Sequence, residues 1–481
     1  MFQRTPVAVA LSLLALSASA LAANSQFSNF TPLPASAGPI PVNGAGEATP
    51  LTLSSVNFSQ KSIADRTTQN NLVAGSNSGN WDMIDTNRTG PDASRYLFMP
   101  FETGTGGVQR VDLWDANYNT RTVTIVAPGT QGFVAGDASR WTPFGSYLTA
   151  EESWGTGSTK GRLFEVTNAT TAAANGGTFI QRSVIPRVSH EGLAFDSAKS
   201  MYFVDELNGG AVYKYVSNNP NATNGNDYFA SGQSFALRVG SGGQFEGTTG
   251  APIVGASSWQ AVTNAAGGAI AGVSTVLGDG TIDGRVTADH ASVLSSGFNR
   301  PEDMEIQTVA GTERVYFATT SSGSFNSGTS RVYNLDVNTG EVKLFADTNT
   351  IDLATGLKVG SGLKSADNLA IDADGNMYII EDRNGGVDND IWFARDLNKD
   401  GDLLDAGEGI GRWASNGTQG SEMTGLFFSL TDPNKAFVNI QHPSSGVDRL
   451  IEISAVPEPS TYAMLLGGLG LVGFVARRRK A

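Results

Sequence analysis

The chain has 481 residues, of which 40% are hydrophobic and 16% charged, with 58 glycines, no cysteine and a net charge of −14. This length can bury one large β domain or two ordinary domains. The acidic charge argues against nucleic acid as a partner and favours divalent cations, and the lack of cysteine excludes disulfides and thiolate metal sites.

Residues 1–22 predict a Sec-type secretory signal, with Arg4 followed by the apolar run PVAVALSLLAL and a small-residue cleavage site at residues 20–22. A buried N-terminal helix is the alternative, and no twin arginine is present. Residues 23–60 are rich in serine, proline, alanine and asparagine, which predicts a flexible lead-in. We therefore expect export to the periplasm in the unfolded state, with any metal acquired there.

Residues 61–454 contain six copies of one pattern, in which a short aromatic or β-branched run is followed after a polar gap by a second such run. The pairs are YLFMPFE with VQRVDLW, YLTAEE with GRLFEV, MYFVDE with AVYKYV, RVYFATT with SRVYNLDV, MYIIED with DIWFA, and AFVNIQ with DRLIEIS. The third gap holds a Gly/Ala/Ser-rich insertion at about residues 218–296. Alternating strands at a long period predict an all-β, six-bladed β-propeller, with a β-sandwich as the alternative.

Carboxylates stand just before four of these pairs, at a similar phase of the repeat. The four are Glu191, Glu305, Asp367 and Glu422. If these segments are the first strands of blades, their ends converge near the propeller axis. The stretch NRPEDMEI adds Glu302 and Asp303 to the same place. Carboxylates crowded into one space repel one another, so the pattern predicts a metal site. For any single acid, decoration of a polar turn is the alternative.

Acidic pairs also occur at the ends of several second strands. They are Glu151 with Glu152, Asp205 with Glu206, and Glu381 with Asp382. Oxygen ligands without thiolates favour calcium over magnesium or manganese. His190 and His442 lie in the motifs SHEG and NIQHP, and for each of them both a structural role and a site role are open.

A separate calcium candidate is the segment DLNKDGDLLDAGE. Its oxygen-bearing residues alternate around Gly401, as at the start of an EF-hand loop, and they are Asp396, Asn398, Asp400 and Asp402. The acid that should close such a loop falls on Gly407, and Glu408 comes one position late. The segment therefore predicts a calcium-loop-like turn or an unmetallated Asp-Gly turn, without a complete EF-hand.

Residues 455–481 form a separate C-terminal segment, in which a VPEPS box precedes about sixteen uncharged residues and a cluster of four basic residues. The apolar run is slightly short for a full membrane span, and the basic cluster favours a cytoplasmic end. The segment closely resembles the PEP-CTERM sorting signal of Gram-negative bacteria. This resemblance implies a sorting helix that meets the membrane only transiently, an exosortase as partner, and a final place at the cell surface or in the extracellular matrix.

The body of the chain resembles the PhoX-type alkaline phosphatases over roughly residues 90–454. The motifs that carry the resemblance are YLTAEES, HEGLAFD, FNRPEDMEI, ADNLAID, IIEDR, DLNKDGD and FVNIQHP, in the expected order. It implies a six-bladed propeller that hydrolyses small phosphomonoesters at a cluster of calcium and iron ions on the propeller axis.

The resemblance and the phase of the acids together give the candidate site residues. The candidate metal ligands are Glu151, Glu191, Glu302, Glu305, Asp367, Glu381, Asp382 and Glu422. Arg300 and Arg383 are expected to face the phosphate, because guanidinium pairs with phosphate oxygens, and Glu152 is the third catalytic candidate.

The chain departs from the family pattern in two ways. The family typically has a cysteine as an iron ligand where this chain has Ala150, and it commonly exports through a twin-arginine signal. Both departures weaken the case for iron and leave the calcium sites untouched. We therefore expect an exported, metal-dependent phosphomonoesterase. The alternatives are a non-catalytic, calcium-binding surface or matrix propeller of the same family and, more remotely, another propeller hydrolase such as a lactonase.

Overall fold

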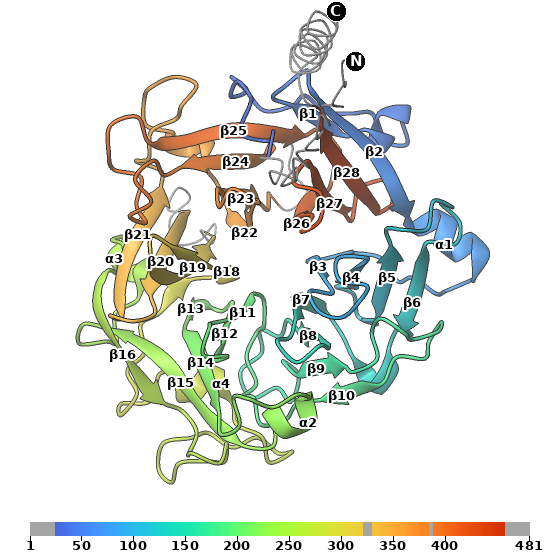
Figure 1. The fold of residues 1–481 in the computed structure, drawn as a ribbon. Helices are drawn as coiled ribbons and strands as arrows, with labels where there is room; N and C mark the ends of the chain where they lie inside the picture. Colours follow the sequence, from blue (N-terminus) through green and yellow to red (C-terminus); the bar gives the residue numbers. More distant parts are fainter. Residues whose placement is uncertain (1–24, 321–329, 384–387, 457–481) are drawn as a thin grey trace, which may run out of the picture.

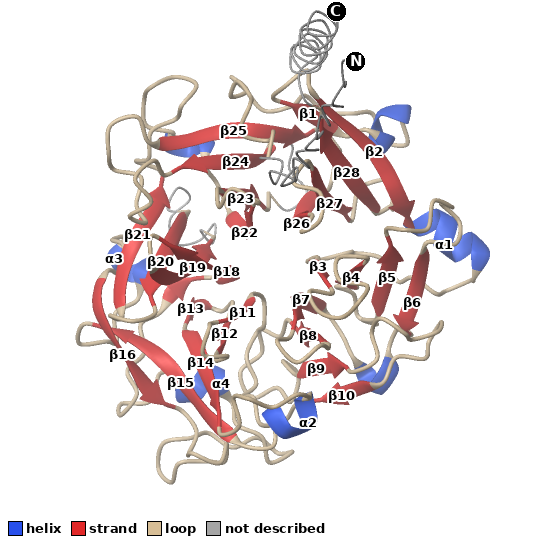
Figure 2. Ribbon diagram, viewed as in Figure 1, coloured by secondary structure: helices blue, strands red, loops and turns tan. Residues whose placement is uncertain are grey.

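The computed structural model describes residues 25–320, 330–383 and 388–456. The predicted signal at residues 1–22 and the sorting segment from residue 457 onward lie outside the described residues. The described ranges are all-β with a few short helices, and none of these helices is long and apolar enough to cross a membrane (Figure 2). The helices are α1 (Arg66–Leu72), α2 (Gly225–Tyr228), α3 (Glu246–Thr249) and α4 (Gly284–Thr287), with 3-10 turns η1 (Ala45–Ala48), η2 (Thr130–Gly132) and η3 (Gly360–Gly362).

The strands form antiparallel sheets that follow one another around a central axis (Figure 1). One four-stranded sheet contains β3 (Asp85–Thr86), β4 (Tyr96–Pro100), β5 (Val108–Asp112) and β6 (Thr122–Val126). The next contains β7 (Gly136–Trp141), β8 (Tyr147–Glu151), β9 (Leu163–Val166) and β10 (Phe179–Gln181).

A nine-stranded sheet follows, with a small ribbon of β13 (Asn208–Gly210) and β17 (Phe298–Asn299) beside it. Its first part contains β11 (Leu193–Phe195), β12 (Met201–Val204), β14 (Val212–Ser217), β15 (Gly232–Val239) and β16 (Gly255–Ala261). Its second part contains β21 (Glu341–Asp347), β20 (Arg331–Asp336), β19 (Thr312–Thr319) and β18 (Pro301–Val309), and the pairing of β16 with β21 joins the two parts.

Two sheets complete the circle, and each takes one strand from the N-terminal part of the chain. The first contains β22 (Ala366–Ile371), β23 (Met377–Glu381), β24 (Asn389–Arg395), β25 (Gly409–Asn416) and β1 (Leu51–Leu53). The second contains β26 (Glu422–Phe428), β27 (Lys435–Gln441), β28 (Arg449–Ala455) and β2 (Phe58–Asp65).

All six predicted strand pairs are antiparallel neighbours in the structure. They are β4 with β5, β8 with β9, β12 with β14, β19 with β20, β23 with β24, and β27 with β28. An inner strand precedes each pair, and β3, β7, β11, β18, β22 and β26 lie nearest the centre in Figure 1. The predicted propeller-like, all-β arrangement is therefore confirmed, and the β-sandwich alternative is wrong.

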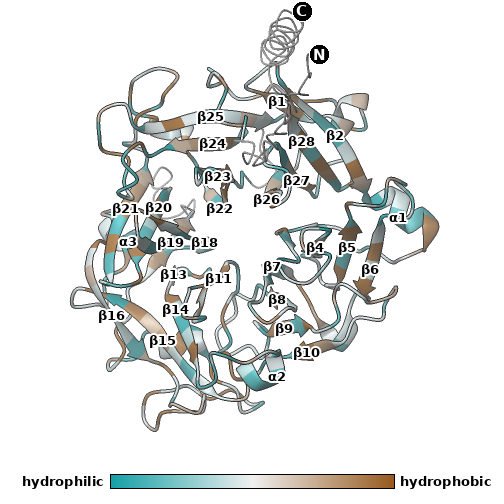
Figure 3. Cartoon of the chain, in the orientation of Figure 1, coloured by the Kyte–Doolittle hydropathy of each residue, from teal (hydrophilic) through white to brown (hydrophobic). Residues whose placement is uncertain are grey.

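The hydrophobic core of the described residues lies between successive sheets, not in one place. Six apolar clusters are found among these residues. Five draw their side chains from two neighbouring sheets, and the sixth, which includes Tyr202 and Phe317, lies between the two parts of the nine-stranded sheet. Figure 3 shows hydrophobic and hydrophilic residues interleaved along the strands, as expected where a sheet buries its faces against its neighbours. Stability is therefore spread around the ring, and the centre is left free for polar side chains.

The structure corrects the prediction of a flexible lead-in at residues 23–60. Phe27 is fully buried, and its ring lies 5.5 Å from those of Phe58 and Trp413. β1 and β2 add strands to the last two sheets, so the N-terminal segment closes the ring. The composition of the segment was misleading because a few buried aromatic rings and backbone hydrogen bonds, and not average polarity, hold it in place.

The structure also corrects the predicted insertion at about residues 218–296. β15 pairs with β14, and β16 pairs with both β15 and β21, so the segment supplies regular strands of the nine-stranded sheet. Its glycine and serine content hid these strands because much of β16 is only partly buried and carries small polar residues.

Three inner strands share one irregularity near their start, where the pairing register shifts by one residue. The shift lies between Gly136 and Ser139 in β7, between Pro301 and Met304 in β18, and between Ala366 and Leu369 in β22. Two residues of the inner strand then lie opposite one residue of its neighbour. This arrangement is a β-bulge, and it changes the direction of the side chains there. The first residue of each bulge is a carboxylate, namely Asp137, Glu302 and Asp367.

The second residue of a bulge connects one inner strand to the next. Asp303 Oδ2 accepts a hydrogen bond from the Leu369 N–H at 3.0 Å, and Asn368 Oδ1 accepts one from the Gly425 N–H at 2.5 Å. Gly192 allows the same closeness one step earlier, because a Cβ there would lie 2.3 Å from the Met304 nitrogen. These contacts hold the inner strands close together and bring the acidic bulge residues into one space.

Candidate metal centre

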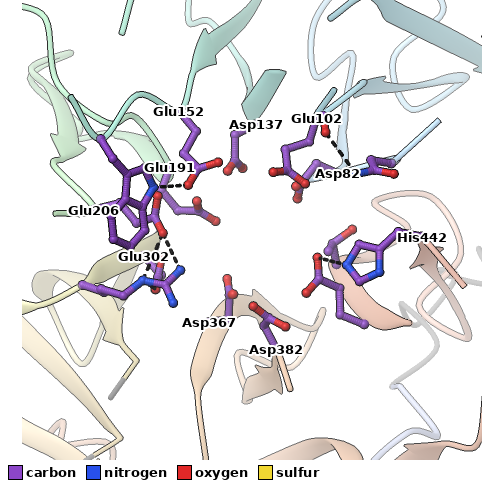
Figure 4. Close-up of a pocket in the computed structure, with 15 residues that line it drawn as sticks. Asp82, Glu102, Asp137, Glu152, Glu191, Glu206, Glu302, Asp367, Asp382 and His442 are labelled. Carbon is purple, nitrogen blue, oxygen red and sulfur yellow. Dashed lines mark hydrogen bonds and ion pairs between the residues drawn. The ribbon is translucent and has the colours of Figure 1, made fainter. Parts of the chain in front are cut away.

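A cavity of about 500 Å³ opens between the inner ends of the sheets. Figure 4 shows its side chains pointing toward one another from several sheets. The lining residues are Asn80, Asp82, Glu102, Asp137, Glu152, Trp154, Glu191, Glu206, Arg300, Glu302, Asp367, Asp382, Glu422, Thr424 and His442. Of the predicted site residues, the cavity brings together Glu152, Glu191, Arg300, Glu302, Asp367, Asp382 and Glu422.

Three of the predicted ligands form a compact triad. One carboxylate oxygen from each of Glu191, Glu302 and Asp367 lies within 4.8 Å of the other two, and no other such group occurs among the described residues. Glu302 and Asp367 come from the bulges of β18 and β22. Glu191 lies two residues before β11, the inner strand that precedes β18 in the ring. The triad has the size and the oxygen chemistry of a hard-cation site.

Burial makes these carboxylates costly to ionise without a cation. Burial raises the pKa of Glu302 to about 7, although Arg300 and a hydrogen bond from Thr320 oppose the shift. The pKa values of Glu191 and Asp367 are raised well above their usual range, first by burial and then by neighbouring carboxylates. A cation bound between them would relieve this repulsion.

The residues just beyond the second strands form another part of the lining. Glu152 and Asp382 follow β8 and β23 directly, and Glu102 and Glu206 come two residues after β4 and β12. Burial and then the charge of Asp82 raise the pKa of Glu102 to about 9. Acids from first and second strands therefore share one cavity.

The structure corrects the prediction that Glu151 and Glu381 are metal ligands. Successive residues of a strand point to opposite faces, so only the second member of each acidic pair reaches the cavity. The first member binds polar groups in the sheet: Arg162 Nε donates to Glu151 at 2.8 Å, and the Trp392 indole N–H donates to Glu381 at 3.0 Å. Both carboxylates are fully buried in these contacts.

Glu305 also lies away from the cavity, which corrects a second predicted ligand. Arg140 donates to its Oε1 from both terminal nitrogens at 3.1 Å. The residue that matches Asp367 in the repeat is Glu302. Each follows the first residue of its strand, and the β18–β19 hairpin, where residue 301 pairs with 319, is longer than the β22–β23 hairpin, where 366 pairs with 381. The spacing of eleven residues before the second-strand tyrosine, here Tyr316, therefore selects Glu305 in place of Glu302.

Arg300 is the only arginine among the described lining residues. Its backbone has a φ of 46°, in the left-handed region that residues other than glycine rarely adopt. Its guanidinium donates to Glu206 at 3.1 Å and lies 3.4 Å from Glu302. The other predicted phosphate-facing residue, Arg383, is not among the lining residues, and its backbone N–H donates to Asn389 Oδ1 at 2.7 Å. Only Arg300 is therefore placed to meet a ligand in the cavity.

The two motif histidines have different environments. His442 lines the cavity, with Nδ1 2.8 Å from the Gly420 carbonyl oxygen and Nε2 3.1 Å from Glu422 Oε1. His190 is fully buried outside the cavity, 5.4 Å from the ring of Phe203, and burial lowers its pKa to about 3. A structural role therefore fits His190, whereas His442 is placed to take part in the site.

The donor set of the cavity fits cations. Ten carboxylates line it, against one arginine and one histidine among the described residues. Asp137 Oδ1 is buried and accepts no hydrogen bond. A buried carboxylate oxygen without a donor, next to nine other acids, needs either protonation or a metal ion.

The loop with Asp396, Asn398, Asp400 and Asp402 lies apart from this cavity, between β24 and β25. Its oxygens accept backbone hydrogen bonds: Asp396 from Lys399 at 2.6 Å and Gly401 at 3.2 Å, and Asp402 from Leu404 at 3.2 Å. Glu408 likewise accepts the Leu397 N–H at 2.8 Å. These hydrogen bonds close the turn, and both the calcium loop and the unmetallated Asp-Gly turn stay predictions.

Sequence reasoning missed Asp82, Glu102 and Asp137 as lining residues. Asp137 lies eleven residues before Leu148, the spacing that separates Glu191 from Tyr202 and Asp367 from Tyr378. The signal was therefore present, but the second-strand tyrosine that marked it elsewhere is a leucine here. Glu102 is the last residue of the segment YLFMPFE, as Glu152 is of YLTAEE, and this shared position also indicated that Glu102 lines the cavity.

Without calcium, we expect the melting temperature to fall as the pH rises from about 5 to about 9. Burial raises the pKa of Asp82 to about 8, that of Glu102 to about 9 and that of Glu302 to about 7, so the folded state holds more protons than the unfolded state above about pH 4. These groups therefore contribute to the free energy of unfolding in acid, and that contribution is lost as the pH rises toward their folded-state pKa values.

Melting curves in calcium-free buffer at several pH values test this, and calcium should flatten the decline. A melting temperature that rises toward alkaline pH would contradict the assignment of a crowded acidic cavity.

Comparison with known proteins identifies the family. A model of the family "Alkaline phosphatase PhoX" matches residues 135–444, which is more than half of the chain. The chain belongs to the PhoX family. The match covers every inner strand from β7 to β26, and with them the triad of Glu191, Glu302 and Asp367. The PEP-CTERM protein-sorting motif matches residues 455–480 of this PhoX-family chain and implies sorting by an exosortase.

Similar solved structures have low identity and low TM-scores. They include a protein of unknown function from Bacteroides thetaiotaomicron (12% identity, 82% of this chain and 76% of that chain covered, TM-score 0.40). Others are an α-L-arabinanase from Penicillium chrysogenum (9%, 78% and 93%, 0.41) and a gluconolactonase from Xanthomonas campestris (10%, 80% and 99%, 0.32). A search of the curated proteins found no significant match.

Ala150 marks where this PhoX-family chain lacks the expected cysteine. Its side chain is fully buried in the apolar cluster between two sheets, with Leu148 and Leu163, and it is not among the cavity-lining residues. An alanine methyl group at this position supplies no ligand for a metal ion.

Deleting residues 457–481 is expected to change where the protein is found but not its melting temperature. The last described strand, β28, ends at Ala455, and the Val456 N–H donates to the Asn57 carbonyl at 2.9 Å. Cell fractionation and thermal melting of the full and shortened chains test this. A shortened chain that cannot fold would show that the sorting segment contributes to the core.

Proposed function

We propose that this PhoX-family protein is an exported, calcium-dependent phosphomonoesterase that acts in the acidic cavity. The observation that carries the proposal is the buried triad of Glu191, Glu302 and Asp367, within 4.8 Å of one another, in a chain that matches an alkaline phosphatase family. Carboxylates in this number and this degree of burial suit calcium, which takes several oxygen ligands in flexible geometry.

The triad would hold the first calcium ion, and the other lining carboxylates are available for further cations. Bound calcium would offset the charge on the phosphoryl oxygens and orient the attacking oxygen. Arg300 would bind a phosphoryl oxygen with its guanidinium, which is 24% exposed. Glu152, which is half-buried in the lining, is the candidate group for moving a proton at the leaving oxygen.

We also propose that the body is a six-bladed propeller that includes residues 25–60. The nine-stranded sheet would then represent two blades joined edge to edge through β16 and β21. The six strand pairs support this count, as do the six apolar clusters, of which five lie between neighbouring sheets and one between the two parts of the nine-stranded sheet. In a Gram-negative host, the predicted Sec signal and the sorting motif would take this body to the periplasm and then to the cell surface or matrix.

Hydrolysis of p-nitrophenyl phosphate by the purified protein tests the function. Parallel assays with calcium, with calcium and ferric iron, and with chelator separate the two metals. We expect turnover that requires calcium and gains little from iron, because the position of the family cysteine is the buried Ala150. Absence of hydrolysis with every divalent or ferric ion tried would overturn the enzyme proposal.

A non-catalytic, calcium-binding surface protein is the second candidate. It is favoured by the contacts of Arg300, whose guanidinium is already paired with Glu206 and Glu302, so that part of its positive charge is neutralised before any phosphate arrives. Calcium binding together with no turnover of any phosphomonoester would select this candidate.

A further inference from the structure

One large apolar side chain lines the otherwise polar cavity. Trp154 is 43% exposed, and among the described lining residues the only other ring is that of His442. An exposed tryptophan within an acidic cavity serves neither to bind a cation through oxygen nor to bury apolar area in the core.

Two contacts fix the plane of this indole. Its Nε1–H donates to Glu152, and the Arg300 guanidinium carbon lies 4.9 Å from the ring centroid. Cation–π stacking and the indole hydrogen bond orient the ring from two directions. The ring is therefore held in a defined orientation beside the one cationic group that could meet a phosphate.

The loop that carries Trp154 is anchored to a distant segment of the chain. Arg285 donates to the carbonyl oxygens of Ser153 at 2.9 Å and Ser158 at 2.6 Å. Asp283 Oδ2 accepts the Gly157 N–H at 2.6 Å, and the side chains of Arg285 and Asp283 form a fully buried ion pair. A buried pair that binds three backbone groups of one short loop keeps the indole in place without help from a ligand.

We propose that Trp154 is a specificity-determining residue that stacks against a planar leaving group, so that aryl phosphates are preferred over alkyl phosphates. This inference rests on the proposed phosphomonoesterase function. A phosphoryl group held near Arg300 would place its leaving group next to the indole, and stacking of a planar ring on an exposed tryptophan is favourable. An alkyl leaving group would gain much less from this surface.

The test compares kcat and KM for phenyl phosphate and for glycerol 2-phosphate in the calcium-loaded protein. Trp154→Ala is expected to lower kcat/KM for phenyl phosphate about tenfold more than for glycerol 2-phosphate, mainly through KM, because stacking stabilises bound substrate and transition state alike. Trp154→Phe should keep most of the wild-type preference for phenyl phosphate over glycerol 2-phosphate. Trp114→Ala is the matched control. Trp114 is also exposed and has Arg95 at 4.9 Å from its ring, but it is not among the lining residues.

An equal loss for both substrates in Trp154→Ala would overturn the proposal and give Trp154 a structural role only. If the wild type hydrolyses neither substrate, the proposed function fails and the stacking surface is judged by calorimetric binding of phenylphosphonate and methylphosphonate. Preference for the phenyl compound in wild type, lost in Trp154→Ala, would support the surface. No preference in the wild type, including no binding of either compound, would overturn it.

Discussion

Replacing Glu302 with glutamine is expected to lower kcat/KM for p-nitrophenyl phosphate by about a hundredfold or more. Glu302 is 1% exposed and shares the triad with Glu191 and Asp367. Glutamine keeps the size of the side chain and can still accept the hydrogen bond from Thr320, but it removes one negative charge from the expected calcium site. Glu191→Gln should behave in the same way, because it removes a charge from the same triad.

The same variant carries an internal check on folding. Burial raises the pKa of Glu302 to about 7, so an uncharged group at this position should leave the calcium-free protein at least as stable as the wild type near neutral pH. Glu341→Gln is the matched control, because Glu341 is exposed on β21. Activity of Glu302→Gln within about twofold of wild type, with normal folding, would show that the triad does not hold a catalytic cation.

Calcium is expected to raise the melting temperature of the protein on the order of 5 °C at about a hundred times its dissociation constant. A cation that binds only the folded state stabilises it by mass action, and here it also relieves repulsion among ten lining carboxylates. Magnesium should give a smaller shift, because it demands a tighter octahedral geometry than this broad cavity offers.

The calcium shift should become smaller in Glu302→Gln and Glu191→Gln but not in Glu341→Gln. Differential scanning fluorimetry with calcium, with magnesium and with chelator measures all of these shifts. Melting curves of the wild type that superimpose with calcium and with chelator would rule out the proposed metal centre.

The sequence alone determined the strand pattern and much of the site. Alternation of hydrophobic and polar residues is a local property, so six strand pairs could be identified, and all six are neighbours in the sheets. The repeat also fixed the phase of Glu191 and Asp367, because the same hairpin length recurs around them. These positions depend on short-range geometry, which a sequence records directly.

Only the tertiary structure decided which acids of a crowded stretch meet in the cavity. A bulge or a longer hairpin changes the register by a few residues, and one residue is enough to turn a side chain to the opposite face of a strand. Glu302 faces the cavity for this reason, whereas Glu305 binds Arg140 and Glu381 binds the Trp392 indole. The burial of Phe27 against the last sheets and the position of Trp154 beside Arg300 likewise depend on contacts between segments far apart in the chain, which no local pattern encodes.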